Sequence, residues 1–174
     1  ERALRDGILG KFTKVITGQL GLPADAPLLR SVLEVLAAIQ PFHVDDRRVS
    51  ALVSTAKPGI DESDVSRALK LLVDGGVIYK RGHLYRLMPD LLGDFLIEQS
   101  CVGADGKLTS FATTLAEHVE PAQLTQLLVN LGRMDWRLTG GDPSNSHLLD
   151  PIWSTLNAID EKYDARIEAV QSAA

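Results

Sequence analysis

Apolar side chains recur every three or four residues along most of this chain, which is the spacing of one face of an α-helix. Residues 4–20 predict an amphipathic lead-in helix that ends at Gly21 and Pro23. Residues 27–39 predict a second helix that is apolar almost all round, and such a helix is expected to be buried.

Two further helices are predicted from their capping residues. Asp45 is expected to cap a helix that stops at Lys57, and Asp61 is expected to cap another that ends at Gly75. Asp64 follows Asp61 at the third helical position, as in a capping box.

The periodicity then changes from helical to β-rich. Residues 77–80 and 83–87 predict two short strands, and Gly82 suits the tight turn between them because it tolerates a positive φ. Three helices followed by a hairpin is the order of a winged helix-turn-helix.

Helical spacing returns after the hairpin. Pro89 is expected to open a helix over residues 90–99, with these side chains pointing inward: Leu91, Leu92, Phe95 and Leu96. A loop at residues 103–106 separates it from three further predicted helices, over residues 109–119, 121–133 and 147–170.

The predicted fold class is therefore mainly α: a winged helix-turn-helix with a small β-hairpin, flanked by an N-terminal helix and by C-terminal antiparallel helices. These last helices resemble the start of an α-solenoid. The expected division is a lead-in helix at 1–26, a winged-helix domain at 27–100 and a repeat-like helical region at 101–174.

Composition and charge narrow the functional classes. Aromatic residues make up only 5% of the chain, which suits helix-on-helix packing, and the net charge is −5. Cys101 is the single cysteine, so no internal disulfide can form and a cytoplasmic, reducing location is expected. No apolar run approaches the roughly 20 residues of a membrane span. The start at Glu1, without a methionine, indicates a fragment of a larger protein.

Chemical motifs are sparse. The sequence has no phosphate-binding GxxxxGK(S/T), GxGxxG, HExxH or GxSxG motif and no Cys/His cluster with metal spacing. His118 beside Glu117 and Glu120 favours a solvated helix end over an acid/base pair, and Cys101 favours a packing residue over a nucleophile. The carboxylates at Asp90, Asp94 and Glu98, four residues apart, favour a solvated face over a cation site. No catalytic, cofactor or metal residue is assigned.

DNA binding is the sharper alternative for a winged helix. Residues 61–74, the predicted recognition helix, carry four carboxylates and two basic side chains, and three of the acids lie at its start. Phosphates would be repelled there. The hairpin is instead basic, so Lys80, Arg81 and Arg86 are the candidate nucleic-acid contacts.

Residues 29–99 resemble the winged-helix domain that follows the ATPase core in STAND-type NTPases, a group that includes NACHT proteins and bacterial antiviral proteins. The resemblance is carried by residues 84–96, Leu-Tyr-Arg-Leu-Met-Pro-Asp-Leu-Leu-Gly-Asp-Phe-Leu. Leu87 stands at the phenylalanine of the family's Phe-x-His, and Phe95-Leu96 stands at its later Phe-Leu. Pro89 occupies the place of a histidine that senses ADP in many members, so nucleotide sensing is not carried over.

The resemblance implies a regulatory, non-enzymatic module of a bacterial signalling ATPase. Its partners would be an upstream nucleotide-binding domain, which would hold ATP or ADP with magnesium, and downstream sensor repeats. Docking and release of the winged helix would bias an off/on equilibrium. The alternative is a DNA-binding transcription regulator whose C-terminal helices dimerise. A membrane partner is not expected.

We expect the isolated chain neither to bind ATP tightly nor to hydrolyse it, because no phosphate-cradling loop is present in the sequence. Equilibrium binding of a fluorescent ATP analogue and a phosphate-release assay would check this. Saturable micromolar binding with turnover would contradict it.

Overall fold

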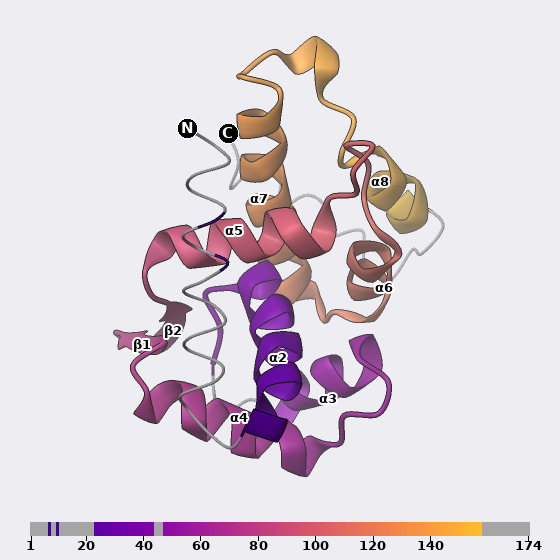
Figure 1. Ribbon diagram of the computed structural model, residues 1–174. Helices are drawn as coiled ribbons and strands as arrows, with labels where there is room; N and C mark the ends of the chain where they lie inside the picture. Colours follow the sequence, from indigo (N-terminus) through magenta and orange to yellow (C-terminus); the bar gives the residue numbers. More distant parts are fainter. Residues whose placement is uncertain (1–6, 8–9, 11–22, 44–46, 158–174) are drawn as a thin grey trace.

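The computed structural model describes residues 7, 10, 23–43 and 47–157 of this 174-residue chain (Figure 1). Within these residues the fold is mainly helical with one small antiparallel sheet, as predicted. The elements are η1 (Pro23–Asp25), α2 (Ala26–Ile39), α3 (Arg47–Ala56), α4 (Glu62–Asp74), β1 (Ile78–Arg81), β2 (Leu84–Leu87), α5 (Asp90–Cys101), α6 (Ser110–His118), α7 (Pro121–Leu138), η2 (Pro143–Asn145) and α8 (Asp150–Asn157).

Helix α2 is the centre of the core. It packs against α3, α4, α5 and α7, and Figure 1 shows α5 lying across one of its ends with α3 and α4 near the other. The predicted burial of this helix is confirmed, because eight of its side chains are fully buried: Leu29, Val32, Leu33, Val35, Leu36, Ala37, Ala38 and Ile39.

The predicted hairpin is confirmed, with Ile78 opposite Leu87 and Arg81 opposite Leu84. Gly82 turns the chain with a φ of 67°. The backbone just after α2 joins this hairpin, because Phe42 N–H donates to Tyr85 O at 3.1 Å and Tyr85 N–H donates to Phe42 O at 2.8 Å. The sheet is thereby fixed to the end of the central helix.

Three polar contacts gather at the C-terminal end of α2. The buried Gln40 accepts a hydrogen bond from Leu87 N–H through Oε1 at 3.1 Å. Asn130 of α7 donates to Ala38 O at 3.0 Å and to Gln40 O at 2.7 Å. Gly93 of α5 lies so close that an added Cβ would be 2.1 Å from Gln40 Nε2.

The C-terminal helices pack on the first half of the fold. Helix α6 contacts α3, α5 and α8, and α7 contacts α2 and α5. A single cluster of buried apolar residues therefore continues across residue 100, where the sequence predicts a domain boundary.

Some predicted details are wrong. Leu91 is 55% exposed, because it shares the outer face of α5 with Asp94, whereas Gly93 and Ile97 belong to the buried face. Asp61 does cap α4, but Asp64 completes no capping box, because its carboxylate binds Arg67 instead.

Two helix bounds also differ from prediction. Helix α7 runs to Leu138 and not to 133, because Met134 and Leu138 continue its inward stripe until Gly140 turns the chain. Helix α8 begins at Asp150, since residues 147–149 form a turn.

Some predictions concern residues that the structure does not describe. Gly7 and Gly10 are helical and Gly10 lies near the ring of Phe95, while the rest of the predicted lead-in helix lies outside the described residues. The predicted cap at Asp45 and the part of the last helix beyond residue 157 also lie outside them.

Replacing Leu69 with alanine should lower the free energy of unfolding by about 2–5 kcal/mol, because the side chain is 4% exposed and its loss would leave a cavity in the core. Urea unfolding followed by circular dichroism would measure the change. Lys70→Ala is the matched control, because the neighbouring side chain is exposed and its removal should be nearly neutral. Similar unfolding midpoints for both variants would mean that Leu69 does not contribute to the core.

Candidate functional site

The N-terminus of α4 is occupied by its own acidic side chains. Asp61 Oδ1 accepts hydrogen bonds from Asp64 N–H at 2.8 Å and from Ser63 Oγ at 2.7 Å. The bond from Asp64 N–H, followed by that from Ser63, lowers the pKa of the Asp61 carboxyl, so this cap is ionised at neutral pH. An incoming phosphate would meet a carboxylate where an anion-binding helix offers free N–H groups.

Arg67, one of the two basic side chains of α4, is held by two carboxylates. It forms ion pairs with Asp25 of η1 and with Asp64 at 3.0 Å. These hydrogen-bonded pairs, that with Asp64 first, raise the pKa of the Arg67 guanidinium. Arg67 and Lys70 are both exposed, as the sequence predicts, but within the described residues only Lys70 is left on this helix without a carboxylate partner.

The three candidate nucleic-acid contacts come together in the hairpin. Lys80 and Arg81 are exposed on β1, and Lys80 Nζ lies 5.8 Å from the centroid of the Tyr85 ring. Arg86 on β2 is only half-buried, but its Nε is enclosed and has no hydrogen-bond partner among the described residues. Arg86 is therefore less available to an external anion than the two residues of β1.

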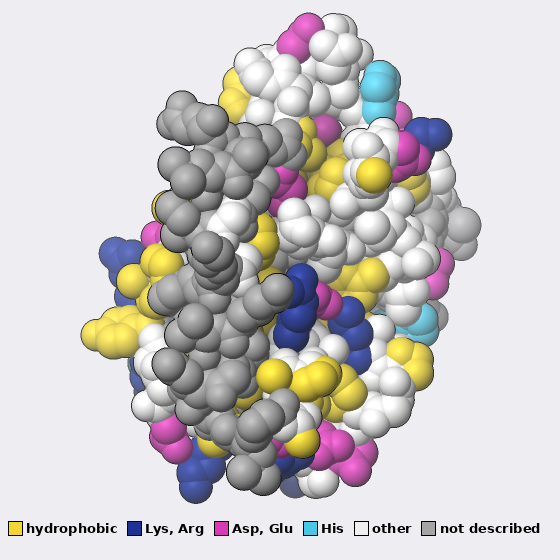
Figure 2. Space-filling view, viewed as in Figure 1, with side chains coloured by type: hydrophobic (Ala, Val, Ile, Leu, Met, Phe, Trp, Pro, Cys, Tyr) yellow, Lys and Arg dark blue, Asp and Glu magenta, His cyan; other side chains and the backbone are white. Residues whose placement is uncertain are grey.

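Apolar side chains border these cations. Tyr79, opposite Arg86 in the ladder, is 63% exposed, and Met88 and Leu91 are 44% and 55% exposed. We call this group, which includes side chains from both faces of the hairpin, the wing surface: Tyr79, Lys80, Arg81, Arg86, Met88 and Leu91. Figure 2 shows hydrophobic and basic side chains side by side over β1, β2 and the start of α5.

Sequence reasoning missed the apolar half of the wing surface. Tyr79 could have been found, because alternation along β1 sends Ile78 to the core and Tyr79 to the opposite face. Leu91 could not, since an apolar residue in the first turn of an amphipathic helix ordinarily predicts burial.

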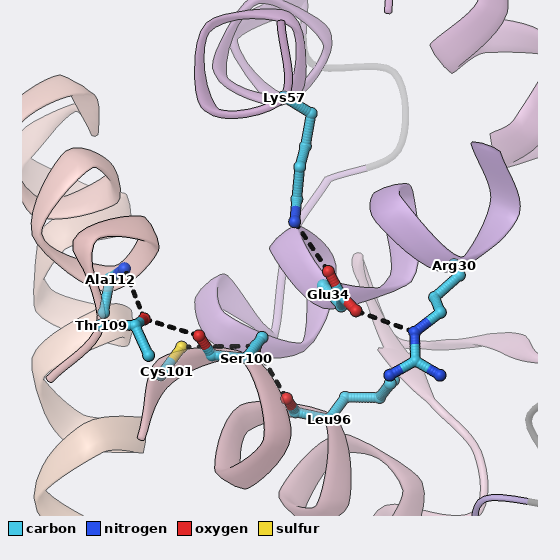
Figure 3. Close-up of polar contacts among 8 residues, drawn as sticks. All are labelled: Arg30, Glu34, Lys57, Leu96, Ser100, Cys101, Thr109 and Ala112. Atoms are coloured by element: carbon cyan, nitrogen blue, oxygen red, sulfur yellow. Dashed lines mark hydrogen bonds and ion pairs between the residues drawn. The ribbon is translucent and has the colours of Figure 1, made fainter. Parts of the chain in front are cut away.

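A second polar cluster joins α2 to the end of α3 (Figure 3). Glu34 accepts from Lys57 Nζ at 2.7 Å and from Arg30 Nε at 3.0 Å. Lys57 Nζ also lies 4.1 Å from the centroid of the Phe111 ring on α6. The arrangement neutralises a largely buried carboxylate and ties three helices together, so its role is structural.

Cys101 lies beside this cluster in a setting that suppresses its reactivity. Burial is the main cause that raises the pKa of the thiol to about 11, and the nearby Glu34 charge adds to it. The Ser100 hydroxyl lies 3.6 Å from Sγ but donates to Leu96 O at 2.7 Å (Figure 3). Among the described residues no basic side chain is hydrogen-bonded to this thiol, so a buried packing role fits Cys101 better than nucleophilic catalysis.

Two further polar candidates make ordinary surface contacts. His118 Nδ1 lies 2.9 Å from Thr114 O at an exposed helix end, and Asp94 pairs with Arg137 of α7. Within residues 23–43 and 47–157, no three His, Cys, Asp or Glu side chains are placed to share a metal ion. None of the helices in this part of the chain has the length and hydropathy of a membrane span.

Comparison of the chain with protein-family models, with curated proteins and with solved structures gives no match.

Cys101 should react very slowly with a thiol-specific disulfide reagent while the protein is folded. At pH 8 a pKa of about 11 leaves roughly one thiol in a thousand ionised, and burial excludes the reagent as well. Absorbance after mixing should therefore show that the coloured thiolate of the reagent is released slowly in buffer and rapidly in guanidinium. The Cys101→Ala variant is the blank. Rapid labelling of the folded chain would show that the thiol is accessible.

Proposed function

We propose that this chain is a non-catalytic protein-interaction module in which residues 27–100 form a winged helix. The order of α2, α3, α4 and the β1–β2 hairpin supports this assignment. The bridge between Phe42 and Tyr85 also supports it. Phe42 lies in the connection between α2 and α3, and its pairing adds a third segment to the sheet.

The observation that carries the proposal is the charge at the start of α4. In the proposed winged helix, α4 corresponds to the helix whose N-terminal residues a helix-turn-helix protein presents to DNA. Asp61 caps it, Glu62 and Asp64 follow, and Arg67 is neutralised by two acids. Contacts with phosphates supply most of the affinity for a duplex, so this surface disfavours DNA and favours a protein partner.

The parent protein proposed here is a bacterial STAND-type signalling ATPase of the cytoplasm, such as an antiviral one. The three residues aligned with the family's motif lie in the core, since Leu87 and Leu96 are fully buried and Phe95 is 6% exposed. In this proposal the winged helix docks on an upstream nucleotide-binding domain, which binds ATP or ADP with magnesium. The helices from residue 101 onward begin the array of sensor repeats.

A DNA-binding transcription regulator is the second candidate, and one observation favours it. Lys80 and Arg81 are exposed at the hairpin, where a winged-helix protein can touch the DNA backbone. Arg86 contributes less, because its Nε is enclosed. Two exposed cations and an acidic helix in the same fold are expected to give weak, salt-sensitive contact without sequence preference.

Selection from a pool of random duplexes near 0.15 M salt should recover no defined site. Because α4 repels phosphate, we expect binding no stronger than a dissociation constant of about 10⁻⁴ M, the weak end of nonspecific DNA binding. Replacing Lys80 and Arg81 with alanine should abolish what remains. Recovery of a palindromic site bound at nanomolar affinity would instead establish the transcription regulator.

One variant, with the three acids at the start of α4 neutralised, distinguishes repulsion of phosphates from recognition of bases. Asp61→Asn, Glu62→Gln and Asp64→Asn together should strengthen duplex binding, because they remove negative charge that faces the phosphates. Weaker binding by this variant would mean that the acids take part in base recognition, and it would favour DNA as the partner.

A further inference from the structure

Strand β1 has an open edge. Met88 N–H donates to Val77 O at 2.8 Å, and polar backbone groups along an antiparallel strand point alternately toward and away from the partner strand. The backbone N–H and C=O groups of Tyr79 and Arg81 therefore point toward β2. Those of Ile78 and Lys80 point away from it. The other edge of the sheet is taken, because β2 pairs with Phe42. Within the described residues, no strand pairs with the outer edge of β1.

The outer edge of β1 combines features of a protected edge with features of an interaction site. A short strand and an edge lysine are common protections against unwanted pairing, and β1 has both. Yet the apolar side chains of Tyr79, Met88 and Leu91 are 63%, 44% and 55% exposed, and exposed apolar side chains in one region mark interaction sites. The wing surface thus combines free backbone groups, apolar contact area and positive charge.

The charges select among occupants. Lys80 and Arg81 favour an acidic partner, and the acidic start of α4 in the same fold disfavours a phosphate backbone. Unpaired backbone groups at a strand edge match an extended peptide, which offers N–H and C=O groups of its own. A base or a phosphate chain lacks that repeating pattern.

We infer that the outer edge of β1 binds an extended, acidic peptide segment of a partner protein, which adds a strand to the sheet. This inference rests on the proposed function as a protein-interaction module. The peptide places an apolar side chain opposite Tyr79 and acidic side chains opposite Lys80 and Arg81, since residues opposite each other in a ladder share a face. Its backbone pairs with the outward groups of Ile78 and Lys80.

Selection of a phage-displayed library of random linear peptides against the whole chain tests the inference. The enriched peptides should combine acidic residues with a large apolar one. A synthetic peptide of the enriched sequence, titrated into isotopically labelled protein, should shift the amide resonances of residues 78–81 more than those elsewhere. Failure to enrich any such sequence overturns the inference.

Lys80→Pro is the decisive variant. It removes an N–H that points away from β2, so the β1–β2 ladder is retained, as it is where proline occurs naturally in edge strands. Lys80→Ala is its matched control, because it removes the same charge but keeps the N–H. The proline variant should weaken binding of the selected peptide by at least about tenfold relative to the alanine variant, the loss expected when a donor is removed and its partner is left unpaired.

A second variant covers the case in which the proline perturbs the hairpin. Lys80→Glu with Arg81→Glu keeps both amides and should abolish binding by repelling the acidic peptide, while Trp136→Ala, at an aromatic residue of α7 that is 61% exposed, should leave binding unchanged. If Trp136→Ala weakened peptide binding and the two glutamates did not, the inference would be overturned. The proposed protein-interaction function would be unaffected. Preferred binding of a single-stranded or duplex DNA pool, lost with the glutamates but not with Lys80→Pro, would overturn the peptide and point to nucleic acid.

Discussion

The fold depends on how the C-terminal end of α2 is satisfied inside the protein. The last carbonyl groups of a helix have no partner within it, and burying them unpaired costs about 1–3 kcal/mol each. Here the amide of Asn130, 92 residues away from Ala38, donates to two of these carbonyls. The Gln40 side chain accepts from Leu87 N–H, and it fits only because Gly93 has no Cβ. One junction thus fixes α5, α7 and the hairpin around the central helix.

This junction explains why the hairpin is held firmly although a two-stranded sheet is marginal by itself. Its inner edge is bonded to Phe42, and Leu87 lies in the core beside Gln40. Strand β1 lies on the outer side of the sheet, and within the described residues no strand pairs with its outer edge. At the other side of α2, Glu34 and Lys57 join α3 to the same core, with the ring of Phe111 stacked beneath the lysine. The polar groups buried here hold helices together. The candidate functional residues lie instead on the surface of the protein.

The two candidate surfaces, the start of α4 and the wing surface, have opposite character. The start of α4 is acidic, and its polar groups are paired within the protein, since Asp61 caps the helix and Arg67 is paired with acids. The wing surface is basic and apolar, and within the described residues no strand pairs with the outer edge of β1. A duplex would have to approach both, and the first repels it. A peptide strand needs only the second, and this difference supports the proposal of a protein partner.

The sequence by itself determined the local structure. Helical and alternating spacing, with the cap at Asp61 and the turn at Gly82, predicted α2, α4, the hairpin and the buried face of α2, because these depend on neighbours a few residues apart. The candidates Lys80, Arg81 and Arg86 also followed from one short basic run. Only the tertiary structure decided that Arg67 is neutralised by Asp25, 42 residues away, that Leu91 is exposed, and that Gly93 admits Gln40. Each of these results from packing between elements distant in the chain, for which periodicity along one element carries no information.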